Sequence, residues 1–132
     1  MYPVEFISYG NGPFDINKFR SPKNIEGRNK PSGGLWASPV GYHPDWKEFL
    51  KNDPPSFFRF RLRRGVKIYI IDCSKDLETL LSGNEVIDFE NTPWDGILLT
   101  EQGLSETKFH PAIYGWDVPS LILLNMKYIE IL

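Results

Sequence analysis

Glycine and proline are the residues that most limit how this chain can fold. It contains 11 of each among 132 residues, and they leave only short uninterrupted segments between them. Glycine favours turns because it adopts positive φ freely, and proline removes a backbone donor from a helix or a sheet. Long helices are therefore excluded, and we expect one domain, residues 1–132, built from short segments joined by turns.

Apolar and alternating runs predict seven or eight short strands. Alternation is clearest at residues 57–63, where phenylalanine and leucine face one side and three arginines face the other. We expect this strand to form a hairpin with the strand at 66–72, in a mostly antiparallel sheet. The other expected strands are at residues 4–9, 35–37, 97–100, 121–124 and 128–132, with shorter candidates at 85–90 and 112–117, the latter a strand or a turn.

Two segments have the periodicity of helices. Residues 44–50 place two aromatic side chains and a leucine at the i, i+3, i+4 spacing of a helix that packs on a core. Residues 74–81 carry three leucines behind a serine that can serve as N-cap. Residues 101–111 are expected to be a polar loop. The fold class is therefore α+β, with a curved or split sheet and two or three short helices.

Composition excludes several classes of function. The formal net charge of −2 gives no general attraction to nucleic acid or anionic lipid. The one cysteine, Cys73, cannot form an internal disulfide, and two distant histidines give no zinc-binding spacing. No apolar run is long enough for a membrane span, and the N-terminus has no signal-peptide pattern. We therefore expect a protein of the reducing cytoplasm.

The segment at residues 30–39 joins two adjacent glycines, Gly33 and Gly34, to a short apolar strand that contains Trp36. Backbone at a glycine can approach a ligand closely, so this segment is compatible with a flat ligand held against an aromatic wall. An ordinary turn before a buried strand has the same pattern. The preceding polar and basic connection, residues 20–33, is either mobile or closed over something, and it is a candidate lid.

In their order along the chain, these elements resemble the ADP-ribosyltransferase fold, a split β-sandwich that binds NAD in a cleft between two small sheets. Within that fold the chain is similar to small phage-encoded members, including anti-CRISPR and other anti-defence proteins. Nearly the whole chain is covered, although each motif is short. The motifs are Ser8-Tyr9 at the end of the first strand, Gly34-Leu35-Trp36-Ala37-Ser38, Trp46 on the following helix, Asp95-Gly96-Ile97, and Asn125 followed by Ile129.

The resemblance implies a set of residues that contact NAD. Ser8 takes the position of the His or Arg that holds the adenosine ribose in the family. Trp36 would lie beside the nicotinamide, the backbone after Gly33 would bind the nicotinamide amide, and Trp46 would be the second stacking aromatic. The implied cofactor-binding residues are Ser8, Tyr9, Gly33, Gly34, Leu35, Trp36, Ser38 and Trp46.

The family's catalytic glutamate is missing, because Ser120 stands at its position relative to Asn125. Asp117 lies three residues earlier and is the acid that we expect to act. Cleavage of the nicotinamide–ribose bond develops positive charge on the sugar, and a fixed carboxylate stabilises that charge. Basic residues of the 20–30 segment, including Lys30, would hold the pyrophosphate.

The implied function is NAD-dependent ADP-ribosylation of a host macromolecule, such as a defence-system component, in the host cytoplasm. The missing glutamate keeps a second hypothesis open: a non-catalytic inhibitor or nucleotide-binding module with the same fold. The structural alternatives also stay open, since Asp117 can be a turn residue and Trp36 and Trp46 can pack in the core. Other candidate acids are Asp95, Glu101 and Glu106.

The arginines of residues 57–64, together with Lys67, support a third hypothesis. They form a basic stripe that could contact nucleic acid or an acidic protein. The alternative interpretation is the solvated face of a strand. Nucleic acid is therefore a possible partner but not the favoured one, and the oligomeric state stays open.

Overall fold

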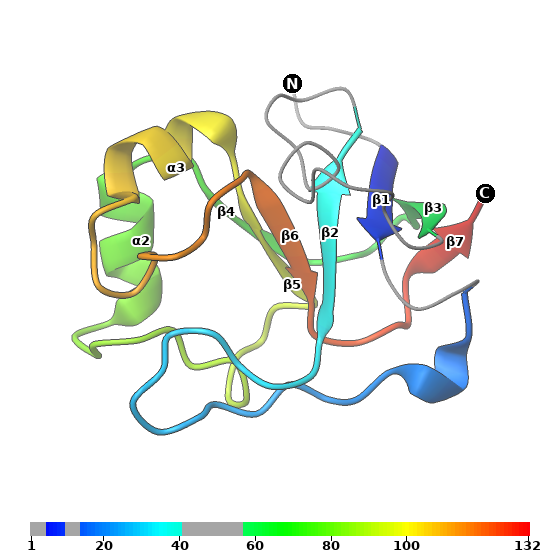
Figure 1. Ribbon diagram of the computed structural model, residues 1–132, viewed down its shortest axis with the longest axis horizontal. Coiled ribbons are helices and arrows are strands. Elements are labelled where there is room, and N and C mark those ends of the chain that lie inside the picture. The colour runs from blue at the N-terminus through cyan, green and yellow to red at the C-terminus, as the bar shows by residue number, and fades with distance from the viewer. Residues whose placement is uncertain (1–4, 10–13, 41–56) are drawn as a thin grey trace.

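The computed structural model describes residues 5–9, 14–40 and 57–132, and in this part of the chain seven strands form one curled sheet (Figure 1). The expected α+β class is confirmed in this form. Across the sheet the strands follow the order β4-β5-β6-β2-β1-β3-β7. Their bounds are β1 Glu5–Tyr9, β2 Leu35–Pro39, β3 Phe57–Leu62, β4 Ile68–Ile71, β5 Gly96–Leu99, β6 Ser120–Leu123 and β7 Ile129–Ile131.

The sheet is mixed, because β4 and β5 are parallel and the other neighbours are antiparallel. A parallel pair requires a crossover, which helix α2 (Ser74–Leu81) supplies between β4 and β5. Helix α3 (Glu101–Thr107) lies beside α2 at the end of the molecule away from β7 (Figure 1). A short 3-10 helix, η1 (Ile16–Lys18), follows β1 in the sequence.

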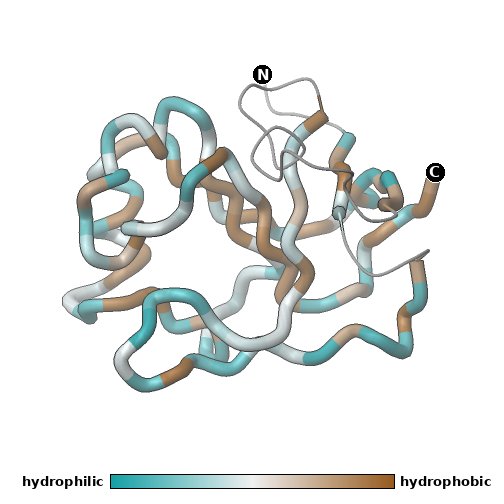
Figure 2. The backbone as a smooth tube through the Cα atoms, in the orientation of Figure 1, coloured by the Kyte–Doolittle hydropathy of each residue, from teal (hydrophilic) through white to brown (hydrophobic). Residues whose placement is uncertain are grey.

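Both faces of the central strands are buried, and every residue of β5 and β6 is buried. On one face, Leu77 and Leu81 of α2 pack with Ile97 and Ile122 of the sheet. The other face is covered by the curl of the sheet itself, through side chains of β1 and β3. Figure 2 shows the resulting concentration of hydrophobic residues in the centre and the hydrophilic character of the connection before β2. Members of the second core include Phe6, Phe60, Leu98, Leu121 and Leu123.

The expected hairpin between residues 57–63 and 66–72 is wrong. β3 pairs with β1 and β7, whereas β4 pairs with β5 in the other half of the sheet. The physical reason is the number of faces that each strand must bury. β4 contributes apolar side chains to both cores, while β3 leaves Arg59 and Arg61 exposed on one face. β4 therefore needs a position with helices on one side and the curled sheet on the other.

The expected loop at residues 101–111 is also wrong, because α3 occupies its first seven positions. Thr100 caps this helix by accepting a hydrogen bond at Oγ1 from the Gly103 N–H at 3.0 Å. The buried positions of the helix are Gly103 and Thr107. An apolar stripe, the usual sequence signal of a packed helix, is therefore absent from the face that α3 buries.

The remaining expectations have mixed outcomes. The helix at residues 74–81 is confirmed as α2, whereas residues 85–90 and 112–117 form bends and turns without strand pairing. The expected helix at 44–50, with Trp46, lies outside the described residues.

Replacing Gly103 with alanine tests how α3 is seated. A Cβ atom there would lie 2.0 Å from the carbonyl oxygen of Ile71 and 2.8 Å from its carbonyl carbon, both of them backbone atoms. We expect Gly103→Ala to lower the free energy of unfolding by about 2–3 kcal/mol, as overpacking against backbone does. Urea denaturation measures this loss. Ser105→Ala, an exposed position of the same helix, is the control and should change stability little; equal stability of both variants would contradict the close packing of α3.

Candidate functional site

The sheet changes partners along β2, and the candidate site lies at this division. Residues 35–37 of β2 pair with β6, whereas Ser38 and Pro39 pair with Ile7 and Phe6 of β1. β2 therefore belongs to both halves of the sheet but pairs with each over only two or three residues. β6 and β1 lie on opposite edges of β2, and the pairing shifts from the β6 edge to the β1 edge between Ala37 and Ser38.

Ser8 stands at the point where β1 and β2 separate. It is one residue beyond the pair between Ile7 and Ser38, and its hydroxyl donates to the carbonyl oxygen of Trp36 at 2.9 Å. Ser8 is 5% exposed. Its donor is thus engaged in holding β1 beside β2, and the acceptor lone pairs of its hydroxyl are the part that a ligand would use.

The two glycines before β2 have positive φ, +76° at Gly33 and +75° at Gly34. A Cβ atom on Gly33 would lie 2.5 Å from the carbonyl oxygen of Ser21, and the N–H of Gly34 donates to the carbonyl oxygen of Arg20 at 2.8 Å. The close approach that glycine permits is therefore made here to another part of the same chain. This contact sets the direction in which the backbone enters β2.

Trp36 meets a second tryptophan that the sequence analysis missed. Its ring and that of Trp116 are edge to face, with centroids 5.0 Å apart and an interplanar angle of 81°. The Lys30 ammonium lies 5.9 Å from the Trp36 ring centroid and donates to the carbonyl oxygen of Gly115 at 2.8 Å. The indole N–H of Trp116 is buried and has no hydrogen-bond partner within the described residues. This corner therefore combines a cation, two aromatic rings and one unsatisfied donor.

Asp117 follows Trp116 directly and is exposed to solvent. Within residues 5–9, 14–40 and 57–132 its carboxylate takes part in no hydrogen bond or ion pair. It lies next in sequence to the Trp116 ring that packs on Trp36, on the same turn that Lys30 contacts. Ser120, at the position of the family's glutamate, is 1% exposed, and its hydroxyl donates to the carbonyl oxygen of Val118 at 2.8 Å.

The other implied site residues are distributed around this corner. Tyr9 is half-buried at the end of β1, with its ring 5.8 Å from that of Phe57. Leu35 packs in the second core, and Ser38 is fully buried. The structure thus joins the Ser8 hydroxyl to the backbone of Trp36 and packs the Trp36 ring on the turn that carries Asp117. Alternation along β1 and β2 places the Ser8 side chain on the face of the sheet that holds Phe6 and Leu35, whereas the Trp36 ring lies on the opposite face. Trp46 lies outside the described residues.

Two of the alternative acids have structural roles. The Asp95 carboxylate accepts the Lys67 N–H at 2.9 Å and the Asn125 side-chain amide at 2.8 Å. The Glu106 carboxylate accepts the Ser74 N–H at the start of α2 at 3.2 Å. Each of these two carboxylates is held by protein donors, whereas Asp117 and Glu101 are exposed and have no hydrogen bond or ion pair within the described residues.

Acidic residues flank the arginine-rich strand β3. Arg59 forms an ion pair with Glu5 at 3.9 Å, and Arg61 lies opposite both Glu5 and Glu130 in the sheet register. The Arg63 guanidinium donates to the carbonyl oxygen of Ile129 at 3.2 Å. Neighbouring carboxylates therefore offset much of the basic stripe that the sequence predicts.

Residues 23–32 form a closed loop, which we call the 23–32 loop, that is fastened to two distant segments. A pair of backbone hydrogen bonds between Lys23 and Ser32, each 2.9 Å, closes its base. The Asn24 side chain donates to the Ile87 carbonyl oxygen at 2.7 Å and accepts the Phe89 N–H at 2.8 Å. The expected lid is thus a loop held against the body of the protein.

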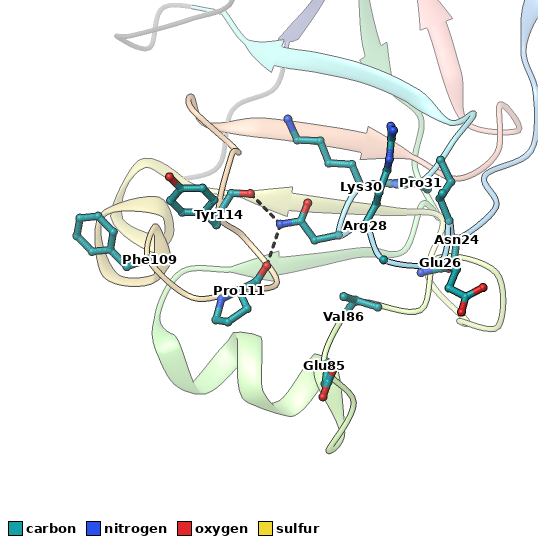
Figure 3. A pocket seen from close by; sticks show the side chains of 13 residues that line it. Asn24, Glu26, Arg28, Lys30, Pro31, Glu85, Val86, Phe109, Pro111 and Tyr114 are labelled. Carbon is teal, nitrogen blue, oxygen red and sulfur yellow. Dashed lines mark hydrogen bonds between the residues drawn. The ribbon is translucent and has the colours of Figure 1, made fainter.

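Asn29 makes the second attachment of the 23–32 loop. Its side-chain amide donates to the carbonyl oxygens of Pro111 and Tyr114, at 2.8 and 2.7 Å (Figure 3). Together with the contact of Lys30, it fixes the turn that leads into Trp116 and Asp117. Sequence reasoning missed both asparagines because nothing local to them indicates partners more than 60 residues away.

Two titratable groups with shifted pKa values lie outside this corner. The Asn91 N–H, with smaller contributions from the Glu90 N–H and the Asn91 side chain, lowers the pKa of Asp88. Burial, followed by the nearby Asp76 and Cys73, raises the pKa of Tyr69. Asp88 thus caps its own turn, and Tyr69 is a structural residue beneath α2 whose hydroxyl donates to the Asp76 carbonyl oxygen at 2.6 Å.

Replacing Asn24 with alanine tests the attachment of the 23–32 loop. The variant leaves the Ile87 carbonyl and the Phe89 N–H without their side-chain partner. We expect Asn24→Ala to lower the free energy of unfolding by about 1–3 kcal/mol in chemical denaturation, since both groups lose a partly buried hydrogen bond. The control is Asn84→Ala, because Asn84 is exposed and its side chain has no partner in the described part of the chain. A loss of similar size in both variants would show that the loop is not fastened through Asn24.

Comparison with known proteins identifies no relative. Models of known protein families, curated proteins and solved structures all give no match. Within the described residues, no three histidine, cysteine, aspartate or glutamate side chains gather in a way that could hold a metal ion. No helix in that part of the chain has the length and apolar character needed to cross a bilayer. The function must therefore be argued from the geometry of the site.

Proposed function

We propose that the protein is an NAD-dependent ADP-ribosyltransferase with a split β-sandwich of the ADP-ribosyltransferase type. The observation that carries the proposal is the division of the sheet at β2, with Ser8 and Trp36 at the division and the Asp117 turn packed beside Trp36 through Trp116. In the family that the sequence resembles, NAD binds between two small sheets. The feature that supports the proposal here is the shift of pairing along β2 from β6 to β1.

The chemistry of the corner fits a dinucleotide. Lys30 donates to one carbonyl oxygen, so its ammonium retains donors for a pyrophosphate. Trp36 is half-buried, and the exposed part of its ring is available to a flat group.

Asp117 is the residue that we assign to the reaction. NAD supplies the ADP-ribosyl group, and the carboxylate stabilises the positive charge that develops at the ribose as the nicotinamide leaves. Its exposure and lack of a fixed partner among the described residues allow it to approach a bound sugar. The acceptor is a macromolecule of a host cell, with a defence-system protein as the proposed target of a phage-encoded enzyme.

Nicotinamide release tests this assignment. The protein is incubated with NAD labelled in the adenylate phosphate and with a bacterial lysate, and both free nicotinamide and labelled macromolecules are measured. We expect Asp117→Asn to lower the rate by roughly 100- to 1000-fold, the usual effect of removing one preorganised electrostatic group. Glu130→Gln, which changes an exposed carboxylate on β7, is the control and should keep the wild-type rate. Equal rates for wild type and Asp117→Asn, or no release by the wild type, would contradict the enzymatic function.

A non-catalytic binding module is the second candidate. The specific observation in its favour is Ser120, which stands at the position of the family's glutamate. Its hydroxyl already donates a hydrogen bond to the Val118 carbonyl oxygen. Calorimetry with NAD and ADP-ribose distinguishes the two functions. Saturable heat with both ligands, without nicotinamide release, indicates binding alone, and a Trp36→Ala variant should then bind more weakly.

A further inference from the structure

An open groove lies between the 23–32 loop and the turn at residues 109–116 (Figure 3). Its volume is about 980 Å³, which is at the upper end of the range for small-molecule sites. The aromatic rings of Phe109 and Tyr114 lie together at one end of it (Figure 3). Glu26 and Glu85 lie toward the other end (Figure 3).

The two aromatic rings are largely exposed to solvent. Phe109 is 80% exposed and Tyr114 is 68% exposed, although neither is needed to cover a core. Within the described residues the Tyr114 hydroxyl has no hydrogen-bond partner. Large aromatic surfaces left in water beside a groove are typical of contact sites.

The turn that carries the two rings is rigid. The N–H groups of Ile113 and Tyr114 donate to the carbonyl oxygen of His110 at 2.9 and 2.8 Å, and Ala112 and Ile113 are fully buried. Asn29 holds the outer side of the turn through the Tyr114 and Pro111 carbonyls. A ligand that contacts the rings therefore does not have to order the backbone beneath them, which reduces the entropic cost of binding.

Three cations lie along the groove: Lys108 and Lys30 contact the turn that carries the rings, whereas Arg28 lies near Asn24 and Glu26, away from Phe109 (Figure 3). The Lys108 ammonium lies 5.2 Å from the Phe109 ring centroid, and Lys30 donates to the Gly115 carbonyl oxygen beside Tyr114. Arg28 is exposed on the groove lining, and its guanidinium has no hydrogen bond or ion pair in the described part of the chain. None of these three cations forms an ion pair within the described residues. Cations beside free aromatic faces match a ligand that carries both phosphates and bases.

We propose that this groove binds single-stranded nucleic acid over a short length. Bases stack on Tyr114 and Phe109, and the phosphodiester backbone passes Arg28, Lys30 and Lys108. The carboxylates of Glu26 and Glu85 repel phosphate and limit the contact to the length between Arg28 and the two rings. A duplex is excluded because its bases are not available to stack on a protein ring. This inference does not rest on the proposed enzymatic function, and its test contains no NAD.

Fluorescence anisotropy of a labelled oligothymidylate of about 12 nucleotides tests the proposal at low salt, about 50 mM. We expect binding that weakens as salt is added. The logarithm of the association constant should fall with the logarithm of the salt concentration with a slope of roughly −1.4 to −2.1, which corresponds to two or three phosphate contacts. Tyr114→Ala and Phe109→Ala should each weaken binding by about 5- to 150-fold, the range for loss of one stacking ring. Tyr114→Phe keeps the ring and should bind like wild type. Arg28→Ala removes one phosphate contact and should make the salt-dependence slope less negative by about 0.7.

Phe57→Ala is the matched control, because Phe57 is a 49% exposed ring on β3 outside the groove. It should leave the affinity unchanged, and circular dichroism should show that each variant keeps its fold. Several results would overturn the proposal. They are no anisotropy change with the wild-type protein, an affinity for the duplex of the same sequence that equals the affinity for the single strand, or displacement of the labelled strand by a polyglutamate peptide as effectively as by the unlabelled strand. Loss of binding in Arg59→Ala but not in Tyr114→Ala would also overturn it, since it would move the contact to β3.

Discussion

The structure depends on the way β2 divides its backbone hydrogen bonds between two neighbours. Residues 35–37 pair with β6 and the last two residues pair with β1, so each half of the sheet meets the other through a very short ladder. The Ser8 hydroxyl adds a bond to the Trp36 carbonyl where the backbone pairs stop. This arrangement allows the sheet to curl, and the curl provides the second core that covers the face of β5 and β6 turned away from the helices.

Local chemistry makes parts of this fold predictable. The apolar runs at residues 97–100 and 121–124 become the buried strands β5 and β6, and the leucines of residues 74–81 become the buried face of α2. Strand pairing was not predictable, because the alternation of residues 57–63 indicates which face of the strand is exposed to solvent but not which strand pairs with it. Helix α3 was not predicted for a related reason: its buried residues are a glycine and a threonine, and the one leucine that packs on the core, Leu104, gives no hydrophobic period.

The candidate site was predictable only in part. Trp36 was singled out from its own segment, and it does lie where the sheet divides, but its partner Trp116 comes from a turn 80 residues later in the sequence. Asn24 and Asn29 act on carbonyl and N–H groups of backbone 63 to 85 residues away. Such pairings depend on the tertiary fold, and no single-sequence pattern encodes them. The pairing of Asp117 with any substrate stays a prediction for the same reason.

The attachments of the 23–32 loop also have a consequence for the order of folding. Its side chains reach backbone groups separated from them by more than 60 positions, so closing these contacts early would cost much chain entropy for few hydrogen bonds. The attachment through Asn29 requires the turn at 109–116 to be in place, and the attachment through Asn24 requires residues 87–89. The loop is therefore expected to join the native state late, and to be among the first parts that detach when the molecule opens locally.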